Sequence, residues 1–150
     1  MKIEFDFDET FDAPPDRVFE ALTDLEGMSD WMPNLESIEV LTDGEIGEGT
    51  RWREKRIMFG KEATETMEFA GFDPPEAFEI RADGSEGTSG GGKYRFGYTI
   101  EPEGEGTHVR VDAEISEVGF VMGIIGKLFT GMFKKPMEKD LTKLKEYLES

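Results

Sequence analysis

The residues with the clearest potential for acid–base chemistry lie on one segment with the alternating pattern of a β-strand. In residues 50–58, Trp52, Glu54 and Arg56 share one face, and three basic residues share the other. A basic trio is far easier to place in water than in a protein interior. The sequence therefore predicts that Glu54 and Arg56 point inward.

A second carboxylate is expected beside this pair. Glu65 falls on the apolar-rich face of the next strand-like segment, together with Met67 and Phe69. Because buried charges without partners are costly, we expect Arg56 to bridge Glu54 and Glu65. Such a cluster would orient the polar end of a ligand or supply an acid for a dehydration. The alternative is that a bulge or the sheet edge lets these side chains form an ordinary surface network.

Other common catalytic groups are missing or badly placed. The chain has no cysteine, which excludes disulfides, thiol nucleophiles and zinc–thiolate sites. Its one histidine, His108, shares a strand face with Arg110, opposite the apolar face that holds Val109. We therefore expect His108 to face solvent, where it cannot serve an acyl-transfer triad in the interior. The sequence assigns no catalytic residue.

Residues 87–93, GTSGGGK, nearly match the phosphate-binding loop of nucleotide-binding proteins. Tyr94 stands where that motif needs Ser or Thr for magnesium, and a strand rather than a helix is expected to follow. We interpret this segment as a hairpin loop at the edge of the interior. The acidic residues fall on wet strand faces or turns without calcium-loop spacing, so no metal ion or other cofactor is predicted.

Charge and composition limit the class of partner. The 150 residues include 34 acidic and 17 basic ones, a formal net charge of −17, which repels the phosphate backbone of nucleic acids. We interpret the acidity as a solvated surface. The length predicts a single domain over residues 1–150, and the acidic N-terminus lacks the apolar stretch of a signal peptide, so we expect a cytoplasmic protein. These features leave the oligomeric state open.

The pattern along the chain predicts an α+β fold with a seven-stranded antiparallel sheet. Apolar and acidic residues alternate over residues 3–8, which indicates a first strand. A short helix is expected from Pro15, Gly27 interrupts it, and Pro33 forces an extended exit. Six further strands are predicted at residues 37–41, 50–58, 62–72, 77–82, 93–100 and 108–115. Short turn signals separate them, so consecutive strands should pair as hairpins.

The last segment, residues 118–149, is predicted to be one long helix with a kink at Pro136. Its second half is amphipathic, because apolar residues that include Leu141 and Leu144 recur every three to four positions. This stripe should pack on the sheet.

The beginning of that helix is apolar but too short to cross a membrane. Lys127 interrupts the apolar run of residues 118–128 well before the roughly 20 residues that a spanning helix needs. An alternative role is peripheral contact with a membrane, because apolar residues such as Phe120 and Ile124 are flanked by lysines.

An aromatic stripe indicates a pocket in the interior. Tyr94, Phe96 and Tyr98 line one face of one predicted strand. Glycines at positions 119, 123, 126 and 131 thin the first half of the C-terminal helix, which then fills less space against the sheet than a packed core needs. Ordinary core packing is the alternative explanation of the rings. The candidate ligand-binding residues are Trp31, Trp52, Glu54, Arg56, Glu65, Met67, Phe69, Phe78, Ile80, Tyr94, Phe96, Tyr98, Phe120, Ile124, Leu128 and Met132.

The order of these elements, with four short motifs, resembles the helix-grip fold of the START-related superfamily. The motifs are APPDRVF at 13–19, DWMP at 30–33, GEGTRW at 47–52 and FDPP at 72–75. This superfamily includes polyketide cyclase/dehydrase-like proteins, pollen-allergen homologues and lipid-transfer domains. The resemblance covers essentially the whole chain and implies two short helices after the first strand and a curved sheet wrapped on the long C-terminal helix.

The resemblance also implies a class of function. In these proteins the space between the sheet and the long helix is commonly a cavity for lipids, polyketides or other apolar compounds. It implies an apolar small molecule as the partner, bound or carried without a cofactor. The alternatives are a polyketide cyclase or dehydratase, and a protein-interaction module with a vestigial pocket.

Overall fold

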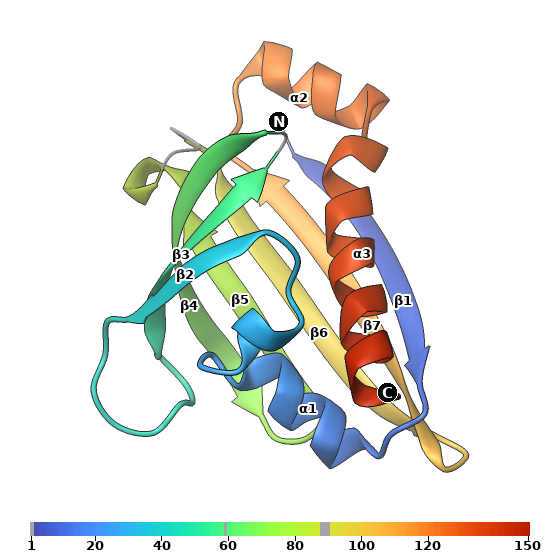
Figure 1. Cartoon of the computed structure of the whole chain (residues 1–150). Coiled ribbons are helices and arrows are strands. Elements are labelled where there is room, and N and C mark those ends of the chain that lie inside the picture. Colours follow the sequence, from blue (N-terminus) through green and yellow to red (C-terminus); the bar gives the residue numbers. More distant parts are fainter. Residues whose placement is uncertain (1, 59, 88–90) are drawn as a thin grey trace.

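A computed structural model describes residues 2–58, 60–87 and 91–150 of the chain (Figure 1). The strands are β1 (Ile3–Phe11), β2 (Leu35–Val40), β3 (Arg51–Met58), β4 (Lys61–Asp73), β5 (Ala77–Asp83), β6 (Lys93–Glu103) and β7 (Gly106–Ser116). The helices are α1 (Pro15–Thr23), α2 (Phe120–Leu128) and α3 (Gly131–Leu148), with short 3₁₀ turns η1 (Met28–Asp30) and η2 (Gly84–Glu86).

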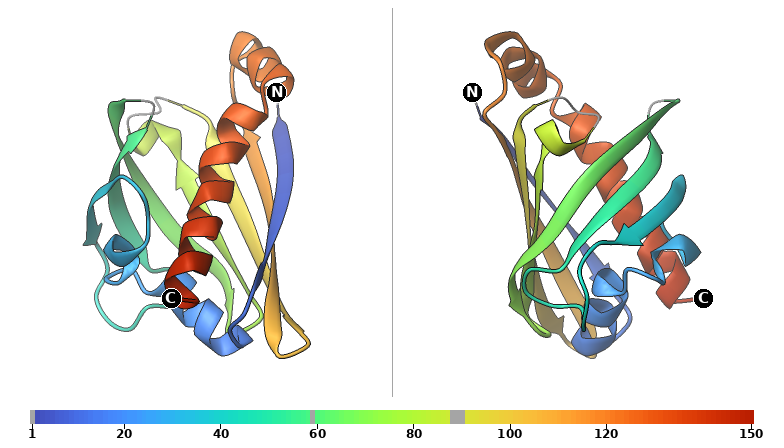
Figure 2. Two further views of the ribbon diagram at one scale, coloured as in Figure 1. Left: turned by 45° about the vertical axis from the view of Figure 1, so that its right-hand side comes forward. Right: turned by 90° about the vertical axis from the view of Figure 1, so that its left-hand side faces the viewer.

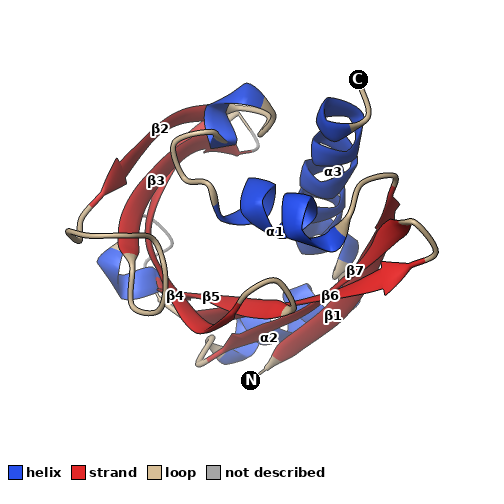
Figure 3. Ribbon diagram, turned by 90° about the horizontal axis from the view of Figure 1, so that it is seen from below, coloured by secondary structure: helices blue, strands red, loops and turns tan. Residues whose placement is uncertain are grey.

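The strands form one antiparallel sheet in the order β1-β7-β6-β5-β4-β3-β2. Strands β2 to β7 follow one another as a meander, and β1 joins it beside β7. The sheet is strongly curved, and α1 and α3 lie within its concave side (Figure 3). The predicted α+β helix-grip architecture, with seven antiparallel strands wrapped on a C-terminal helix, is confirmed.

The alternation of β1 gives this edge strand one buried face and one hydrated face. Ile3, Phe7 and Phe11 are buried, whereas Glu4, Asp6 and Asp8 are exposed on the opposite face. Phe7 lies opposite the buried Val111 of β7. The apolar face of the strand therefore extends the core, and its acidic face is hydrated.

Helix α1 covers one end of the concave surface. Pro15 is its first residue, where the missing amide hydrogen costs no intrahelical bond. Val18, Phe19 and Leu22 are buried, and the Phe19 ring packs edge-on against Phe78 of β5 at 5.6 Å between centroids. The predicted second short helical element is the 3₁₀ turn η1.

Helix α3 crosses the concave side of the sheet and runs beside β1 (Figure 2). Leu141 and Leu144 of its apolar stripe are only 3% and 0% exposed. The predicted packing of this stripe is confirmed.

The prediction of one continuous helix over residues 118–149 is wrong. The helix breaks at Phe129, whose backbone leaves the helical region, and Pro136 lies further along inside α3. The Thr130 hydroxyl donates to the carbonyl of Gly126 at 3.0 Å and so satisfies one of the carbonyls that the end of α2 exposes. Helix α2 consequently turns away from α3 and lies across the end of the molecule next to the N-terminus (Figure 1).

The glycine-rich loop predicted at the edge of the interior lies partly outside the described residues. Its positions 88–90 belong to that part, and on either side the structure has η2 and the beginning of β6. Among the described helices, none is long and apolar enough to cross a membrane.

Candidate ligand-binding site

The concave face of the sheet carries the predicted aromatic residues. Cross-strand pairing places Phe78 beside Tyr98, and their rings stack at 4.5 Å between centroids. The ring centroids of Trp52 and Phe69 are also 4.5 Å apart, and both side chains are almost completely buried. Most of the apolar candidates from the sequence lie in or against this core: Trp31, Trp52, Met67, Phe69, Phe78, Ile80, Phe96 and Tyr98. Tyr94 continues the row of β6 next to Phe96.

A charged pair interrupts this apolar surface. Arg56 of β3 binds Asp140 of α3 with both terminal nitrogens, at 2.9 and 2.8 Å, and also donates to the carbonyl of Pro33 at 2.9 Å. The side chains of Arg56 and Asp140 are 12% and 17% exposed. A bidentate pair of this kind is rigid and directional. The pair connects α3 to β3 across the concave side of the sheet.

Glu54 and Arg56 point inward, as predicted from the sequence. The prediction that Arg56 bridges Glu54 and Glu65 is wrong. Arg56 instead pairs with Asp140, 84 residues away along the chain. The sequence pattern contains one signal for this partner. Asp140 lies three residues after Met137 and four before Leu144, and thus on the same helical face as the buried stripe.

Glu54 is the most unusual ionisable group of the cluster. It is 8% exposed, and no hydrogen bond is formed to its carboxyl group within the described residues. The pKa of Glu54 is raised to about 7, chiefly by burial. The positive charge of Arg56 opposes this rise, and the negative charges of Asp140 and of Glu65, directly across on β4, contribute to it. Glu54 therefore exchanges its proton close to neutral pH.

Two further groups complete the electrostatics. Burial, together with the negative charges of Asp140 and Glu54, raises the pKa of the interior Tyr98 above its ordinary value, so the phenol stays protonated. Burial also raises the pKa of Asp140, although its bonds to Arg56 act in the opposite direction. The cluster thus holds a neutral phenol, a carboxyl group that titrates near neutrality and a fixed ion pair.

An open groove of about 700 Å³ leads to this cluster from the end of the sheet near α2. Arg56 and Asp140 belong to its lining, together with Pro33, Met58, Leu128 and Met132. The predicted residues Leu128 and Met132 therefore lie beside the polar cluster, but on an open groove and not around an enclosed pocket. A second hollow, of about 420 Å³, lies at the η2 end of β4, β5 and β6, and its lining is mainly charged.

Phe120 and Ile124 do not border the interior, contrary to the prediction. They lie on α2 and are 71% and 39% exposed. The glycines of α2 have a different effect from the one expected: Gly123 and Gly126 are buried, and a β-carbon at Gly126 would collide with the side chain of Ile3. Gly126 thus allows α2 to lie close to β1, and the buried glycines do not widen a cavity.

Other candidate chemistries find little support in the described residues. His108 lies on the outer face of the sheet, as predicted, with its Nε2 2.7 Å from a carboxylate oxygen of Asp8. Within the part of the chain that the structure describes, no group of three His, Cys, Asp or Glu residues is arranged to hold a metal ion.

The sequence matches the profile of the family described as polyketide cyclase / dehydrase and lipid transport, over residues 2–149. The chain belongs to this family. No curated protein matches the sequence.

Solved structures with the same architecture come from bacteria and plants. The chain is 27% identical to TTHA0849 from Thermus thermophilus, with a TM-score of 0.77 and 95% of this chain and 94% of that one covered. It is 17% identical to the Zhui aromatase/cyclase from Streptomyces sp. R1128, with a TM-score of 0.79 and coverages of 99% and 94%. For the ginseng major latex-like protein 151 from Panax ginseng the identity is 12%, the TM-score 0.80, and the coverages 98% and 97%. These likenesses support the helix-grip fold.

Proposed function

We propose that the protein binds an apolar small molecule that carries one polar group, in the space between the concave face of the sheet and α3. The ligand enters through the groove beside Leu128 and Met132, and its polar end meets the cluster of Glu54, Arg56 and Tyr98. The observation that carries this proposal is the buried ion pair of Arg56 and Asp140, which sits where an otherwise apolar surface meets the open groove.

The energetic cost of this cluster supports a role in recognition. Replacing a buried ion pair by apolar residues is often neutral or stabilising, so such a pair is weak evidence for a purely structural role. Glu54 and the Tyr98 hydroxyl form no hydrogen bond within the described residues. A protonated Glu54 and the Tyr98 phenol can both donate a hydrogen bond, so they suit a carbonyl or carboxylate oxygen on the ligand.

The size and lining of the groove are consistent with a small-molecule site. Its volume of about 700 Å³ lies in the usual range for ligand pockets. Apolar side chains such as Leu128 and Met132 alternate there with a few polar groups, which is the typical composition of such sites.

The experiment is a fluorescence titration with an environment-sensitive apolar dye, followed by displacement with fatty acids and with aromatic polyketides. We expect saturable dye binding and competition by ligands that carry a carbonyl or carboxylate. Tyr98→Phe should lower the affinity for those competitors by about 2- to 10-fold, which corresponds to the loss of one neutral hydrogen bond. The affinity for hydrocarbons without a hydrogen-bond acceptor should not change. The neighbouring Thr99→Val, on the exposed face of β6, is the matched control.

The dye could also bind to the exposed apolar side chains of α2, and this signal has to be separated from binding in the interior. The titration is therefore repeated on a variant with Phe120→Ser and Val121→Ser, in which interior binding should persist. If no compound of the panel competes in either background, or if the α2 substitutions abolish all dye binding, the proposal is wrong.

A second candidate function is a cyclase or dehydratase. It is favoured by Glu54, whose pKa of about 7 suits a general acid or base near neutral pH, and by its position beside Arg56 and the protonated Tyr98. Dehydration of an aromatic β-hydroxyketone can be followed by its ultraviolet absorbance. As the acid, Glu54 should give a rate that falls above about pH 7, and Glu54→Gln should remove the reaction while Glu39→Gln retains it. A turnover unaffected by Glu54→Gln would exclude this role.

A further inference from the structure

An ordinary surface helix buries its large apolar residues and exposes its small or polar ones. Helix α2 does the reverse. Gly123 and Gly126 are buried, and Gly126 lies directly against Ile3 of β1. The large apolar residues of α2, of the turn after it and of the first turn of α3 face solvent instead: Phe120, Val121, Met122, Ile124, Ile125, Leu128, Phe129 and Met132 are between 39% and 72% exposed. A continuous apolar patch of this kind marks an interaction site.

The charge around this patch differs from that of the rest of the molecule. The chain carries 34 acidic residues, yet residues 118–137 contain none of them and include Lys127, Lys134 and Lys135. Glu117, directly before this stretch, is paired with Lys93 at 3.1 Å. In a protein with a net charge of −17, α2 and the beginning of α3 therefore form a locally basic segment.

We propose that α2 and the beginning of α3 form a docking surface for an anionic lipid bilayer. The apolar side chains enter the boundary between headgroups and acyl chains, and the lysines contact negatively charged headgroups. Nine residues of helix measure about 14 Å, so α2 lies in the plane of the membrane surface and does not cross it. This proposal does not depend on the identity of the ligand bound in the interior.

The charge pattern favours a bilayer over a second copy of the chain. A two-fold interface through α2 would bring the lysines of both copies together and would unite two chains of strongly negative net charge. An anionic bilayer instead supplies both an apolar layer and charges opposite to those of Lys127, Lys134 and Lys135. Acidic residues towards the far end of the sheet interact weakly with such a surface, because salt screens charges beyond about 8 to 10 Å. Glu4 of β1 lies beside Lys127 and is paired with Lys2 at 3.8 Å.

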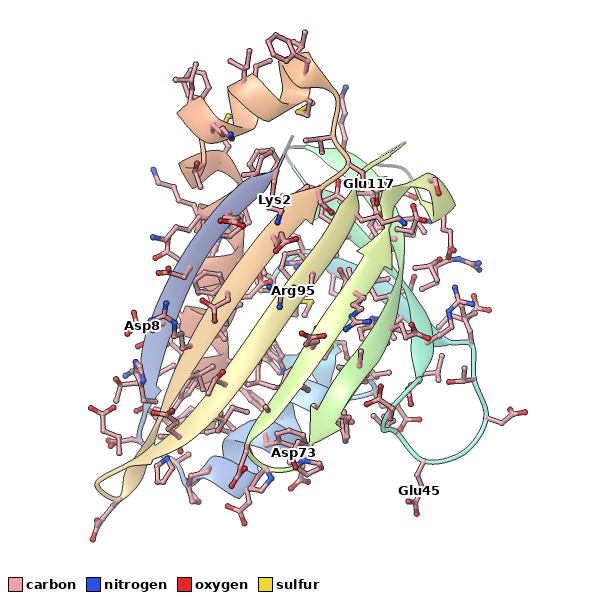
Figure 4. All side chains as sticks on the ribbon, turned by 180° about the vertical axis from the view of Figure 1, so that it is seen from behind. Lys2, Asp8, Glu45, Asp73, Arg95 and Glu117 are labelled. Atoms are coloured by element: carbon pink, nitrogen blue, oxygen red, sulfur yellow. The ribbon has the colours of Figure 1, made fainter. Side chains whose placement is uncertain are left out.

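The shape of the molecule allows this contact. Helix α2 projects at one end, and α1 and the C-terminus lie at the other end (Figures 1 and 2). Seen from the convex side of the sheet, the side chains of α2 extend from the tip of the molecule, while charged groups such as Arg95 occupy the middle of the sheet (Figure 4). The groove is lined by Leu128, Phe129 and Met132, so it opens beside the docking surface. A molecule dissolved in the bilayer would have a short path to the interior.

The experiment is sedimentation of the full chain with vesicles of phosphatidylcholine alone or with added phosphatidylglycerol. We expect binding to the mixed vesicles that declines as salt is raised. The affinity for the mixed vesicles should fall by about 10-fold or more in each of two double variants. One carries Phe120→Ser and Val121→Ser, and the other carries Lys127→Glu and Lys134→Glu. None of these four residues lines the groove. Arg17→Glu with Lys143→Glu, an equal change of charge on α1 and in the second half of α3, should leave vesicle binding as in the wild type.

Three results would overturn the proposal. The first is no binding to either vesicle, and the second is equal binding to both, which would remove the role of the lysines. The third is self-association in sedimentation velocity, abolished by the α2 substitutions without any vesicle binding, which would assign the patch to a second copy of the chain. Dye displacement from the interior should be unchanged in the α2 variants, so a failure of this proposal is distinguishable from a failure of the proposed ligand binding.

Discussion

Replacing Glu54 by glutamine should change how the stability of the protein depends on pH. Burial raises the pKa of Glu54 from 4.5 to about 7, so folding favours its protonated form. The stabilisation associated with that proton is fully present below pH 4.5 and is lost as the pH rises through 7. Glutamine has nearly the same shape as the protonated side chain and stays neutral at every pH.

The magnitude follows from the two pKa values. Each pH unit over which the group is protonated only in the folded chain is worth about 1.4 kcal/mol. The interval from 4.5 to about 7 therefore corresponds to about 3 kcal/mol. We expect Glu54→Gln to be close to the wild type in stability at the acidic end and up to about 3 kcal/mol more stable at about pH 8.

The assay is urea unfolding of wild type and variant, followed by circular dichroism, over a series of pH values from the acidic to the alkaline side of neutrality. The difference between the two free energies of unfolding removes the effect of the overall negative charge, which both proteins share. Glu39→Gln, on the exposed edge strand β2, controls for the loss of any one carboxylate. A difference that stays constant with pH, or a variant that is less stable than the wild type under alkaline conditions, would refute the reasoning, because it would mean that Glu54 is charged and well solvated or paired.

Three further predictions concern packing and the ion pair. Leu144→Ala should lower the free energy of unfolding by about 2 to 5 kcal/mol, measured by urea unfolding, because the side chain is completely buried; a loss below about half a kcal/mol would contradict the packing of α3. Gly126→Val should lift α2 from β1 and speed amide hydrogen exchange in α2, whereas Gly131→Ala, where an added β-carbon would meet open space, should not; equal exchange in both variants would contradict the close approach. Arg56→Met and Asp140→Leu should each cost about 3 to 5 kcal/mol and the double variant much less than the sum, since each single change leaves a buried charge unpaired; additive losses would show that the pair is not coupled.

Local patterns were sufficient for the architecture of this protein. Alternation of apolar and polar residues has a period of two in a strand, so the inward direction of Glu54, Phe96 and Tyr98 could be predicted without knowing the neighbouring elements. Turn residues between short apolar runs predicted the order of the meander. The helical spacing of Leu141 and Leu144 likewise predicted the face of α3 that packs on the sheet.

The partner of Arg56 depended on the tertiary structure. Strand parity brings Arg56 to the concave side, but which carboxylate it meets depends on where α3 crosses that side. Asp140 lies 84 residues away, and Glu54 and Glu65, although nearer on the sheet, accept no hydrogen bond from Arg56. No local pattern encodes that crossing point, although the position of Asp140 on the apolar helical face is compatible with it.

The character of α2 was likewise decided by packing across the chain. The sequence of residues 118–128 predicts a helix with many glycines, and glycines leave space only if the opposite surface keeps its distance. Here Ile3 of β1 comes close to Gly126, so the space is filled, and the large side chains of the other face are left in solvent. The amino-acid sequence by itself thus determined the strands, their order and the stripe on α3, because these follow from local periodicity. Only the tertiary structure decided that α2 separates from α3, which of its faces is exposed and which charges meet in the interior, because these depend on contacts between residues far apart in the chain.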